Sequence, residues 1–271
     1  MRSILIHADA TPAMEARFQT GLDIARRTNG HVRLHVNTPL QRFVAMDPFG
    51  GAYVATAAVE QARANEDALI EEFSARLTRE DVPWNIEASG TELADGLGES
   101  AALCDLVIVS LEGRDGAKGG SASPSPAANL AVTIRAPLLA LPVDAGPVAL
   151  DDTAVVAWNG SAQSARALRA AVPMLQWAER VVVATIGDSD SGIPATDALH
   201  YLSLHDVHAE LVERPRGTGT IEETLDMLIA ETGAAWIAMG AFGHGPLREA
   251  LFGGVTRYFL DGSTVPLLLS H

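Results

Sequence analysis

The sequence predicts an α/β protein built from two consecutive parallel sheets, each flanked by helices. Short runs rich in β-branched residues and leucine alternate with longer, alanine-rich amphipathic stretches, a pattern typical of β-α-β units. The same order of elements occurs twice, about 140 residues apart, which suits tandem domains and is too long for a solenoid repeat. Together the alternation and the repeat predict the fold class.

The first half is expected to supply one of the sheets. Its strands are predicted at Ile4–His7, Val32–Asn37, Pro83–Ala88, Leu106–Leu111 and Pro137–Pro142. Helical periodicity fills the intervals at Ala13–Thr28, Val54–Thr78, Glu92–Leu103 and Ala127–Arg135. Two further stretches are rich in Gly, Pro or Ser and are predicted as surface loops, Thr38–Ala52 and Glu112–Pro126.

The second half repeats this order. Its strands are predicted at Ala154–Trp158, Val181–Ile186, His208–Val212, Trp236–Met239 and Pro266–Ser270. Its helices are predicted at Ala162–Trp177, Thr196–Leu204, Ile221–Glu231 and Val255–Leu260, with Ser161 as the N-terminal cap of the first of them. The matching segments are Asp105–Ser110 with Ala235–Gly240, Val132–Thr133 with Val255–Thr256, and Ala136–Leu139 with Val265–Leu268.

A short linker separates the two predicted domains. The stretch Asp144–Asp152 mixes turn-forming residues with charge. We therefore expect one domain over residues 1–145 and a second over residues 146–271.

The composition excludes several functional classes. The chain of 271 residues has 34 acidic against 19 basic side chains, and Lys118 is its single lysine. Nucleic-acid binding needs clustered Lys and Arg, so no nucleic-acid partner is expected. The apolar runs are too short to span a membrane, and no signal peptide precedes the first strand. A single cysteine, Cys104, fits a reducing compartment, so we expect a cytoplasmic protein without a membrane partner.

A glycine motif follows the fourth predicted strand of the second half. Gly240, Gly243 and Gly253 have the spacing G-x2-G-x9-G and are followed by Gly254, where a helix is expected to begin. Ligands of open parallel sheets bind at the carboxyl ends of the strands. Glycines there let backbone amides approach an anion, and the helix directs its free N–H groups toward it. The motif lacks the Lys-Ser/Thr pair of a P-loop, and the same G-x2-G spacing also occurs in ordinary turns.

On this motif, the sequence resembles the universal stress protein family in its tandem two-domain form. The resemblance covers Gly240, Gly243, Gly253, the connecting segment 245–252 and the trailing Val255-Thr256. It implies two Rossmann-like domains of the adenine nucleotide alpha hydrolase-like type. Each would have a five-stranded parallel sheet in the order 3-2-1-4-5, with helices on both faces. Family members pair through the last strand, so the resemblance also implies pairing of the two halves at Leu138–Pro142 and Leu267–Ser270. That pairing would make a pseudo-dimer of one chain, with a homodimer of chains as a further option.

The sequence departs from the family pattern at two positions of the second half. Gly254 stands where ATP-binding members have Ser or Thr, and Asn159 stands where they have an Asp after the first strand. In the first half the acid is present as Asp9, but the glycine positions correspond to Ser110, Gly113 and roughly Ser123. We therefore expect a single nucleotide site, in the second half.

The resemblance implies a set of nucleotide-binding residues. The backbone of Gly240, Gly243, Gly253, Gly254 and Val255 would hold phosphates and Thr256 would add a hydroxyl, while adenosine would lie against Asn159, Thr185 and Met239. His244 and Arg248 either contact phosphate or face solvent. The expected ligand is ATP, with ADP or AMP as alternatives and Mg²⁺ as companion of a triphosphate. No catalytic residue and no metal-ligating residue is nominated.

Three functions remain open at this stage. The first is a stress-response regulator that binds an adenine nucleotide in its C-terminal domain and acts on a protein partner that the sequence does not identify. The second is a nucleotide-independent scaffold or stress chaperone that works through protein contacts. The third is a weak ATPase, for which the sequence nominates no general base. A metal site at His200, His205 and His208 is disfavoured by their spacing, and Cys104 is interpreted as a core residue.

Overall fold

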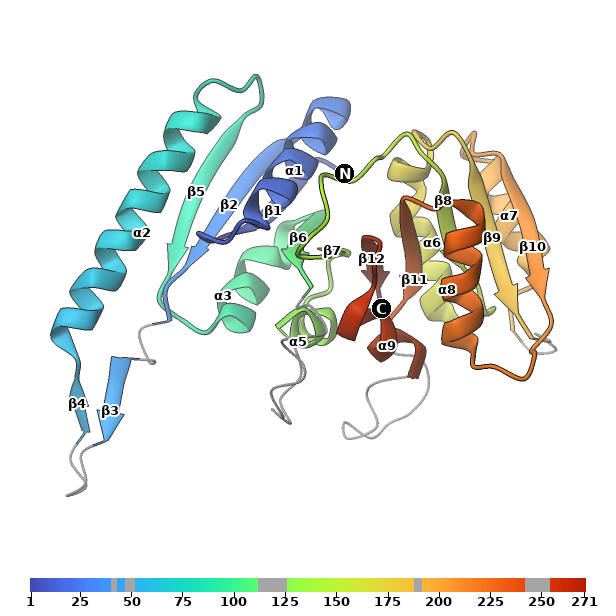
Figure 1. Ribbon diagram of the computed structural model, residues 1–271. Helices are drawn as coiled ribbons and strands as arrows, with labels where there is room; N and C mark the ends of the chain where they lie inside the picture. Colours follow the sequence, from blue (N-terminus) through green and yellow to red (C-terminus); the bar gives the residue numbers. More distant parts are fainter. Residues whose placement is uncertain (40–42, 47–51, 112–125, 188–191, 242–253) are drawn as a thin grey trace.

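The computed structural model describes residues 1–39, 43–46, 52–111, 126–187, 192–241 and 254–271. Its centre is a single open sheet of ten strands, in the order β10-β9-β8-β11-β12-β7-β6-β1-β2-β5 (Figure 1). The first five strands in this order, β10 to β12, come from the second half of the chain, and the last five, β7 to β5, come from the first half. The predicted α/β class is confirmed.

Each half builds its part of the sheet with the same topology. The first half contributes β1 (Ser3–Ala8), β2 (His31–Asn37), β5 (Trp84–Ser89), β6 (Leu106–Ser110) and β7 (Leu138–Leu141). The second contributes β8 (Ala154–Ala157), β9 (Val181–Ile186), β10 (Ala209–Arg214), β11 (Trp236–Gly240) and β12 (Leu267–Ser270). Within each half all pairings of this sheet are parallel, and the predicted order 3-2-1-4-5 is found in both.

The two halves meet through their last strands. β12 pairs antiparallel with β7, with Leu267 opposite Ala140 and Leu269 opposite Leu138. The sheet is therefore continuous, and two edges that would otherwise expose unpaired backbone groups are joined. Arg27 adds a link on the surface, because its two terminal nitrogens lie 2.7 and 2.6 Å from the carboxylate oxygens of Asp151.

Helices cover both faces of the sheet. One face carries α1 (Met14–Thr28), α2 (Thr56–Leu77), α6 (Ala162–Leu175) and α7 (Ala195–Ser203). The other carries α3 (Leu93–Ser100) with the 3₁₀ turn Ala101–Leu103, α5 (Pro126–Thr133), α8 (Ile221–Thr232) and α9 (Gly254–Gly262). The central strands are apolar because both of their faces are buried under helices, whereas the edge strands β5 and β10 carry polar residues and are partly exposed.

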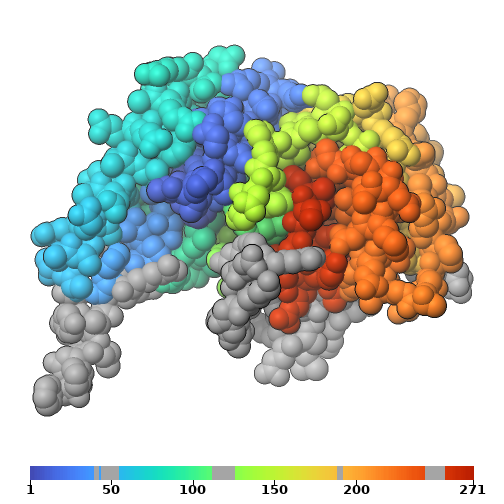
Figure 2. Space-filling view, in the orientation of Figure 1, coloured from blue at the N-terminus to red at the C-terminus, as the bar shows by residue number. Residues whose placement is uncertain are grey.

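Two details of the sequence interpretation were wrong. The predicted loop Thr38–Ala52 contains strand β3 (Val44–Met46), which forms an antiparallel hairpin with β4 (Ala52–Val54). This hairpin and the start of α2 extend beyond the sheet at one end of the molecule (Figures 1 and 2). In addition, Val132 and Thr133 end α5, whereas Val255 and Thr256 begin α9, so these two pairs are not equivalent.

None of the helices in the described ranges is both long and apolar enough to cross a lipid bilayer.

Candidate functional site

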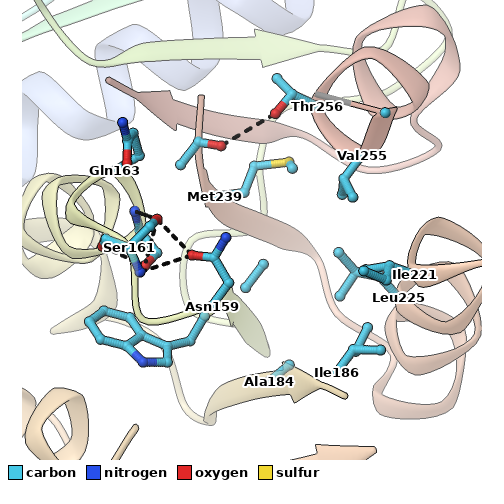
Figure 3. Close-up of a pocket in the computed structure, with 15 residues that line it drawn as sticks. Asn159, Ser161, Gln163, Ala184, Ile186, Ile221, Leu225, Met239, Val255 and Thr256 are labelled. Carbon is cyan, nitrogen blue, oxygen red and sulfur yellow. Dashed lines mark hydrogen bonds between the residues drawn. The ribbon is translucent and has the colours of Figure 1, made fainter. Parts of the chain in front are cut away.

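A pocket of about 200 Å³ lies at the carboxyl end of the strands in the second half. It is bounded by the ends of β8, β9 and β11 and by the first turns of α6, α8 and α9 (Figure 3). β8 and β11 are neighbours in the sheet, but α6 leaves β8 on one face and α8 leads to β11 on the other. The chain therefore diverges between these two strands, and such a switch point is where open α/β sheets bind ligands.

The pocket has an apolar side and a polar side. The apolar side chains are those of Ala157, Trp158, Ala184, Ile186, Ile221, Leu225, Met239 and Val255. The polar side chains are those of Asn159, Ser161, Gln163, Ser164 and Thr256. Asn159, Ser161 and Gln163 lie across the pocket from Ile186, Ile221 and Leu225 (Figure 3). Among the described residues no charged side chain lines the pocket. Such a lining suits an uncharged, flat, partly apolar group with hydrogen-bonding atoms at its rim.

Asn159 forms the turn that leads from β8 into α6. Its Oδ1 accepts hydrogen bonds from the Ser161 N–H at 3.2 Å and the Ser161 hydroxyl at 2.7 Å. Ser161 in turn accepts the N–H of Ser164 at 3.1 Å and caps α6, as its sequence position predicts. Because the oxygen of the Asn159 amide is used in the turn, its nitrogen is directed toward the open middle of the pocket (Figure 3).

Gly240 is required by packing as well as by its place in the pocket. A Cβ at this position would lie 2.7 Å from the backbone carbon of Gln163 and from the nitrogen of Ser164. The first turn of α6 can therefore approach the end of β11 only because residue 240 has no side chain. The carbonyl of Gly240 also accepts the hydroxyl of Thr256 at 3.4 Å, which ties α9 to β11 (Figure 3).

The first turn of α9 forms another part of the lining. Gly254, Val255 and Thr256 are its first residues, and all three border the pocket. The N–H groups of a first helical turn have no partner within the helix and lie at the positive end of its dipole. This turn is therefore the part of the lining best suited to an anionic group.

Six of the predicted site residues meet in this pocket. They are Asn159, Met239, Gly240, Gly254, Val255 and Thr256. The predicted residues Gly243, His244, Arg248 and Gly253 lie outside the described residues.

Thr185 does not line the pocket. It is 4% exposed, and the lining comes instead from its neighbours Ala184 and Ile186. Successive side chains of a strand point to opposite faces, so Thr185 is directed toward the other layer of helices.

Sequence reasoning also missed most of the apolar side of the pocket, apart from Met239 and Val255. The alternation along β9 could have identified Ala184 and Ile186 once the face of the site was known. Ile221 and Leu225 come from α8, which approaches the pocket only through tertiary packing. Trp158 is 5% exposed and also lines the pocket, and its indole N–H donates to the carbonyl of Ile193 at 3.1 Å.

The first half has a crevice at the equivalent place, with a volume of about 370 Å³. Ile4 pairs with Leu106 in the first half as Ala154 pairs with Trp236 in the second. This register makes Asp9 the counterpart of Asn159. The turns agree, because Asp9 accepts the N–H of Thr11 at 2.9 Å as Asn159 accepts that of Ser161.

An ion pair between buried Arg17 and half-buried Asp9 lies in this first-half crevice. The guanidinium of Arg17, 1% exposed, lies 2.7 Å from Asp9 and donates to the Ser110 hydroxyl at 3.0 Å. Burial opposes ionisation of Asp9, but the charge and hydrogen bonds of Arg17 outweigh it and lower the pKa of Asp9. Arg17 of the same chain is thus the counter-ion of Asp9, the acid that follows β1.

His7 borders the same crevice. Burial, helped by the positive charge of Arg17, lowers the pKa of His7 to about 4. The imidazole is therefore neutral at pH 7, and Arg17 and Asp9 balance one another.

The two crevices differ systematically in side-chain size. We call the small positions of the second half the small set: Ala157, Ala167, Ala184 and Gly240. Strand register makes His7, His35 and Ser110 the counterparts of Ala157, Ala184 and Gly240. Arg17 follows Asp9 in the chain at the same distance as Ala167 follows Asn159, and these four counterparts, His7, Arg17, His35 and Ser110, form the large set. Ala157, Ala184 and Gly240 line the second-half pocket. His7, Arg17 and Ser110 line the first-half crevice, where Arg17 binds Ser110 and the neighbouring Asp9.

The remaining sequence candidates lie elsewhere. Within the described ranges, no group of three or more His, Cys, Asp or Glu is arranged to hold a metal ion. Cys104 is half-buried, and its Sγ lies 3.3 Å from a guanidinium nitrogen of Arg33. Its environment is thus more polar than the predicted core position.

Comparison with known proteins agrees with this architecture. Residues 152–271 match the sequence model of the universal stress protein family. A universal stress protein from Archaeoglobus fulgidus is similar over 99% of this chain and 96% of its own, with a TM-score of 0.74 and 12% identity. A candidate universal stress protein from Pseudomonas aeruginosa covers 100% of this chain and 93% of its own, with a TM-score of 0.56 and 16% identity. Curated protein sequences give no match. Residues 152–271 thus form a domain of the universal stress protein family, within a chain whose whole length has the fold of universal stress proteins.

Proposed function

We propose that the protein is a cytoplasmic stress-response regulator that binds one adenine nucleotide, ATP or a relative of it, in the pocket of its second half. The observation that carries the proposal is the division of the pocket. Its apolar side ends at the first turn of α9, so one ligand can contact both. An adenine ring matches the apolar side, and phosphate matches the free N–H groups of the helix turn.

The polar rim supports the same ligand. The Asn159 amide nitrogen faces the pocket, and the hydroxyls of Ser161 and Thr256 border it (Figure 3). These groups can donate to or accept from ribose hydroxyls. In the first half the acid after the first strand, Asp9, is paired with Arg17. Ala167 stands at the position of Arg17 in the second half, so an acid at position 159 would have no such cation, and the uncharged Asn159 needs none.

The contents of the first-half crevice support one site per chain. There the acid, Asp9, is already paired with Arg17, and Ser110 accepts a hydrogen bond from the same guanidinium. A ligand would have to break this buried pair, which is costly when one partner is left without the other.

A regulatory role is proposed in preference to catalysis. The described lining of the pocket contains no Asp, Glu, His, Cys or Lys that could serve as a general base. Binding without turnover would make the nucleotide a signal to a protein partner.

The proposal is tested by isothermal titration of the purified full chain with AMP, ADP and ATP. Ala184→Leu places a larger apolar side chain in the open space of the pocket and should reduce affinity at least tenfold, because the adenine ring and the leucine compete for one volume. Thr185→Val is the matched control, since Thr185 faces the other helical layer. It should bind as the unmodified protein does.

Circular dichroism and thermal unfolding establish that both variants fold. Full affinity in Ala184→Leu would show that the nucleotide binds elsewhere. If no nucleotide binds to the unmodified chain, the pocket is not a nucleotide site, and the nucleotide-independent scaffold becomes the better account of the protein.

A further inference from the structure

An acidic side chain of α8 lies against the first turn of α9. Oε1 of Glu222 is 2.8 Å from the point that a Cβ on Gly254 would occupy. Gly254 is the first residue of α9 and borders the pocket. The Glu222 carboxylate is therefore in contact with the end of the helix that suits an anion.

The packing of α8 on α9 determines this position. Asp226, four residues after Glu222, accepts a hydrogen bond from the Tyr258 hydroxyl of α9 at 2.6 Å. Residues four apart share one face of a helix, so the face that carries both acids is turned toward α9. Ile221, next to Glu222, contributes its side chain to the apolar side of the pocket. Glu222 thus stands at the point where the pocket meets the helix turn.

The charge of Glu222 lies close to where a ligand's phosphates would bind. In the described part of the chain no ion pair of Glu222 is found, and no Arg, Lys or His lines the pocket. A carboxylate at the positive end of a helix stabilises the helix. The same carboxylate repels an anionic ligand at that place, and the repulsion grows with the number of phosphate groups.

We propose that Glu222 is a specificity-determining residue that makes the pocket select a nucleoside monophosphate over the corresponding triphosphate. This inference rests on the nucleotide-binding function proposed above and narrows its ligand. A single phosphate can use the N–H groups of the first turn of α9. Each further phosphate brings negative charge near the Glu222 carboxylate, with no cation from the described lining to offset it.

The test is a titration of the full chain with AMP and with ATP, in the absence of divalent cations and at constant ionic strength. Glu222→Gln keeps the size and hydrogen-bonding capacity of the side chain and removes its charge. Glu213→Gln is the matched control, because Glu213 lies opposite Thr185 in the β9–β10 pairing, on the face turned away from the pocket.

The unmodified protein should bind AMP more tightly than ATP. In Glu222→Gln the affinity for ATP should rise about fivefold relative to that for AMP, the equivalent of about 1 kcal/mol. Glu213→Gln should leave the ratio of the two affinities unchanged. Raising the salt concentration should narrow the gap between AMP and ATP in the unmodified protein and have less effect in Glu222→Gln.

The outcomes separate this inference from the proposed function. If both nucleotides bind and Glu222→Gln leaves their ratio unchanged, or if the unmodified protein prefers ATP, Glu222 does not set the preference and the inference is wrong, while nucleotide binding stands. If neither nucleotide binds to any of the three proteins, the proposed function fails, and the inference fails with it.

Discussion

The two halves of the chain have one topology, and their equivalent crevices have opposite contents. In the second half the small set of side chains leaves a pocket with an uncharged lining. In the first half Arg17, His7 and Ser110 bring in a guanidinium, an imidazole and a hydroxyl, and Arg17 pairs with Asp9. The fold supplies a crevice at the switch point in both cases. Side-chain size and internal charge determine the chemistry of its lining.

Volume alone would favour the first-half crevice over the proposed site. The first-half crevice is the larger, about 370 Å³ against about 200 Å³. In that crevice Arg17 already binds Asp9 and Ser110, although its Nε has no hydrogen-bond partner among the described residues, whereas the Asn159 amide nitrogen in the smaller pocket faces open space. The proposal of the second-half pocket therefore depends on its open, uncharged lining and not on its volume.

Removal of the Arg17 side-chain charge should have the largest effect. Arg17→Met leaves the Asp9 carboxylate without its partner, so the free energy of unfolding should fall by roughly 3 kcal/mol. Urea unfolding at pH 7 measures the loss. The double variant Asp9→Asn, Arg17→Met should recover part of it, because no unpaired charge remains. A loss under about 1 kcal/mol would mean that the pair behaves as a surface ion pair and does not hold the first-half crevice closed.

Acidification should weaken the first half through His7. The pKa of His7 is about 4 in the folded protein against 6.5 in the unfolded chain, so the unfolded state takes up a proton first as the pH falls. Stability should therefore decrease from about pH 6.5 downward, by roughly 2 kcal/mol between pH 7 and pH 5.

The measurement is the urea midpoint at pH 7 and pH 5, for the unmodified chain and for His7→Gln. The variant lacks the titrating group and should lose less stability over this range. Equal losses in the two proteins would assign the effect to other groups. Asp9 contributes to the pH dependence only at more acidic pH. Its pKa is lowered in the folded protein, so the stability that depends on its charge is lost as the pH falls through that lowered pKa.

Restoring the family's hydroxyl in the second half should have the smallest effect. Gly254→Ser adds one hydrogen-bond donor at the first turn of α9. The affinity for an adenine nucleotide should therefore increase by about twofold to tenfold, which corresponds to the net free energy of one hydrogen bond. The added Cβ requires the Glu222 side chain to move, since its Oε1 is 2.8 Å away. Titration of both proteins with AMP measures the change. A decrease in affinity would mean that the displaced carboxylate obstructs the site more than the hydroxyl helps it.

The sequence predicted most of the fold because alternating apolar runs mark buried parallel strands clearly. The order of strands came from the family resemblance, and β7 and β12 were expected to pair for the same reason. The β3–β4 hairpin was missed because Gly and Pro in 38–52 indicate turns without showing that the residues between them pair.

The site was predicted less completely than the fold. Residues close to the glycine motif, such as Gly254 and Thr256, could be placed by sequence distance alone. Thr185 was chosen in place of Ala184 because the strand pattern does not state which face carries the pocket. Glu222 reaches α9 only through the packing of two helices, and neither its neighbours nor its spacing in the sequence marks it.

The pairing of β7 with β12 has a consequence for how the protein responds to dilution. Two separate chains that met through these strands would dissociate when their concentration fell below the dissociation constant. Here both strands belong to one polypeptide, so each is held near the other at a high effective concentration. The ten-stranded sheet therefore persists at any expression level, and its assembly state carries no information about how much of the protein the cell has made.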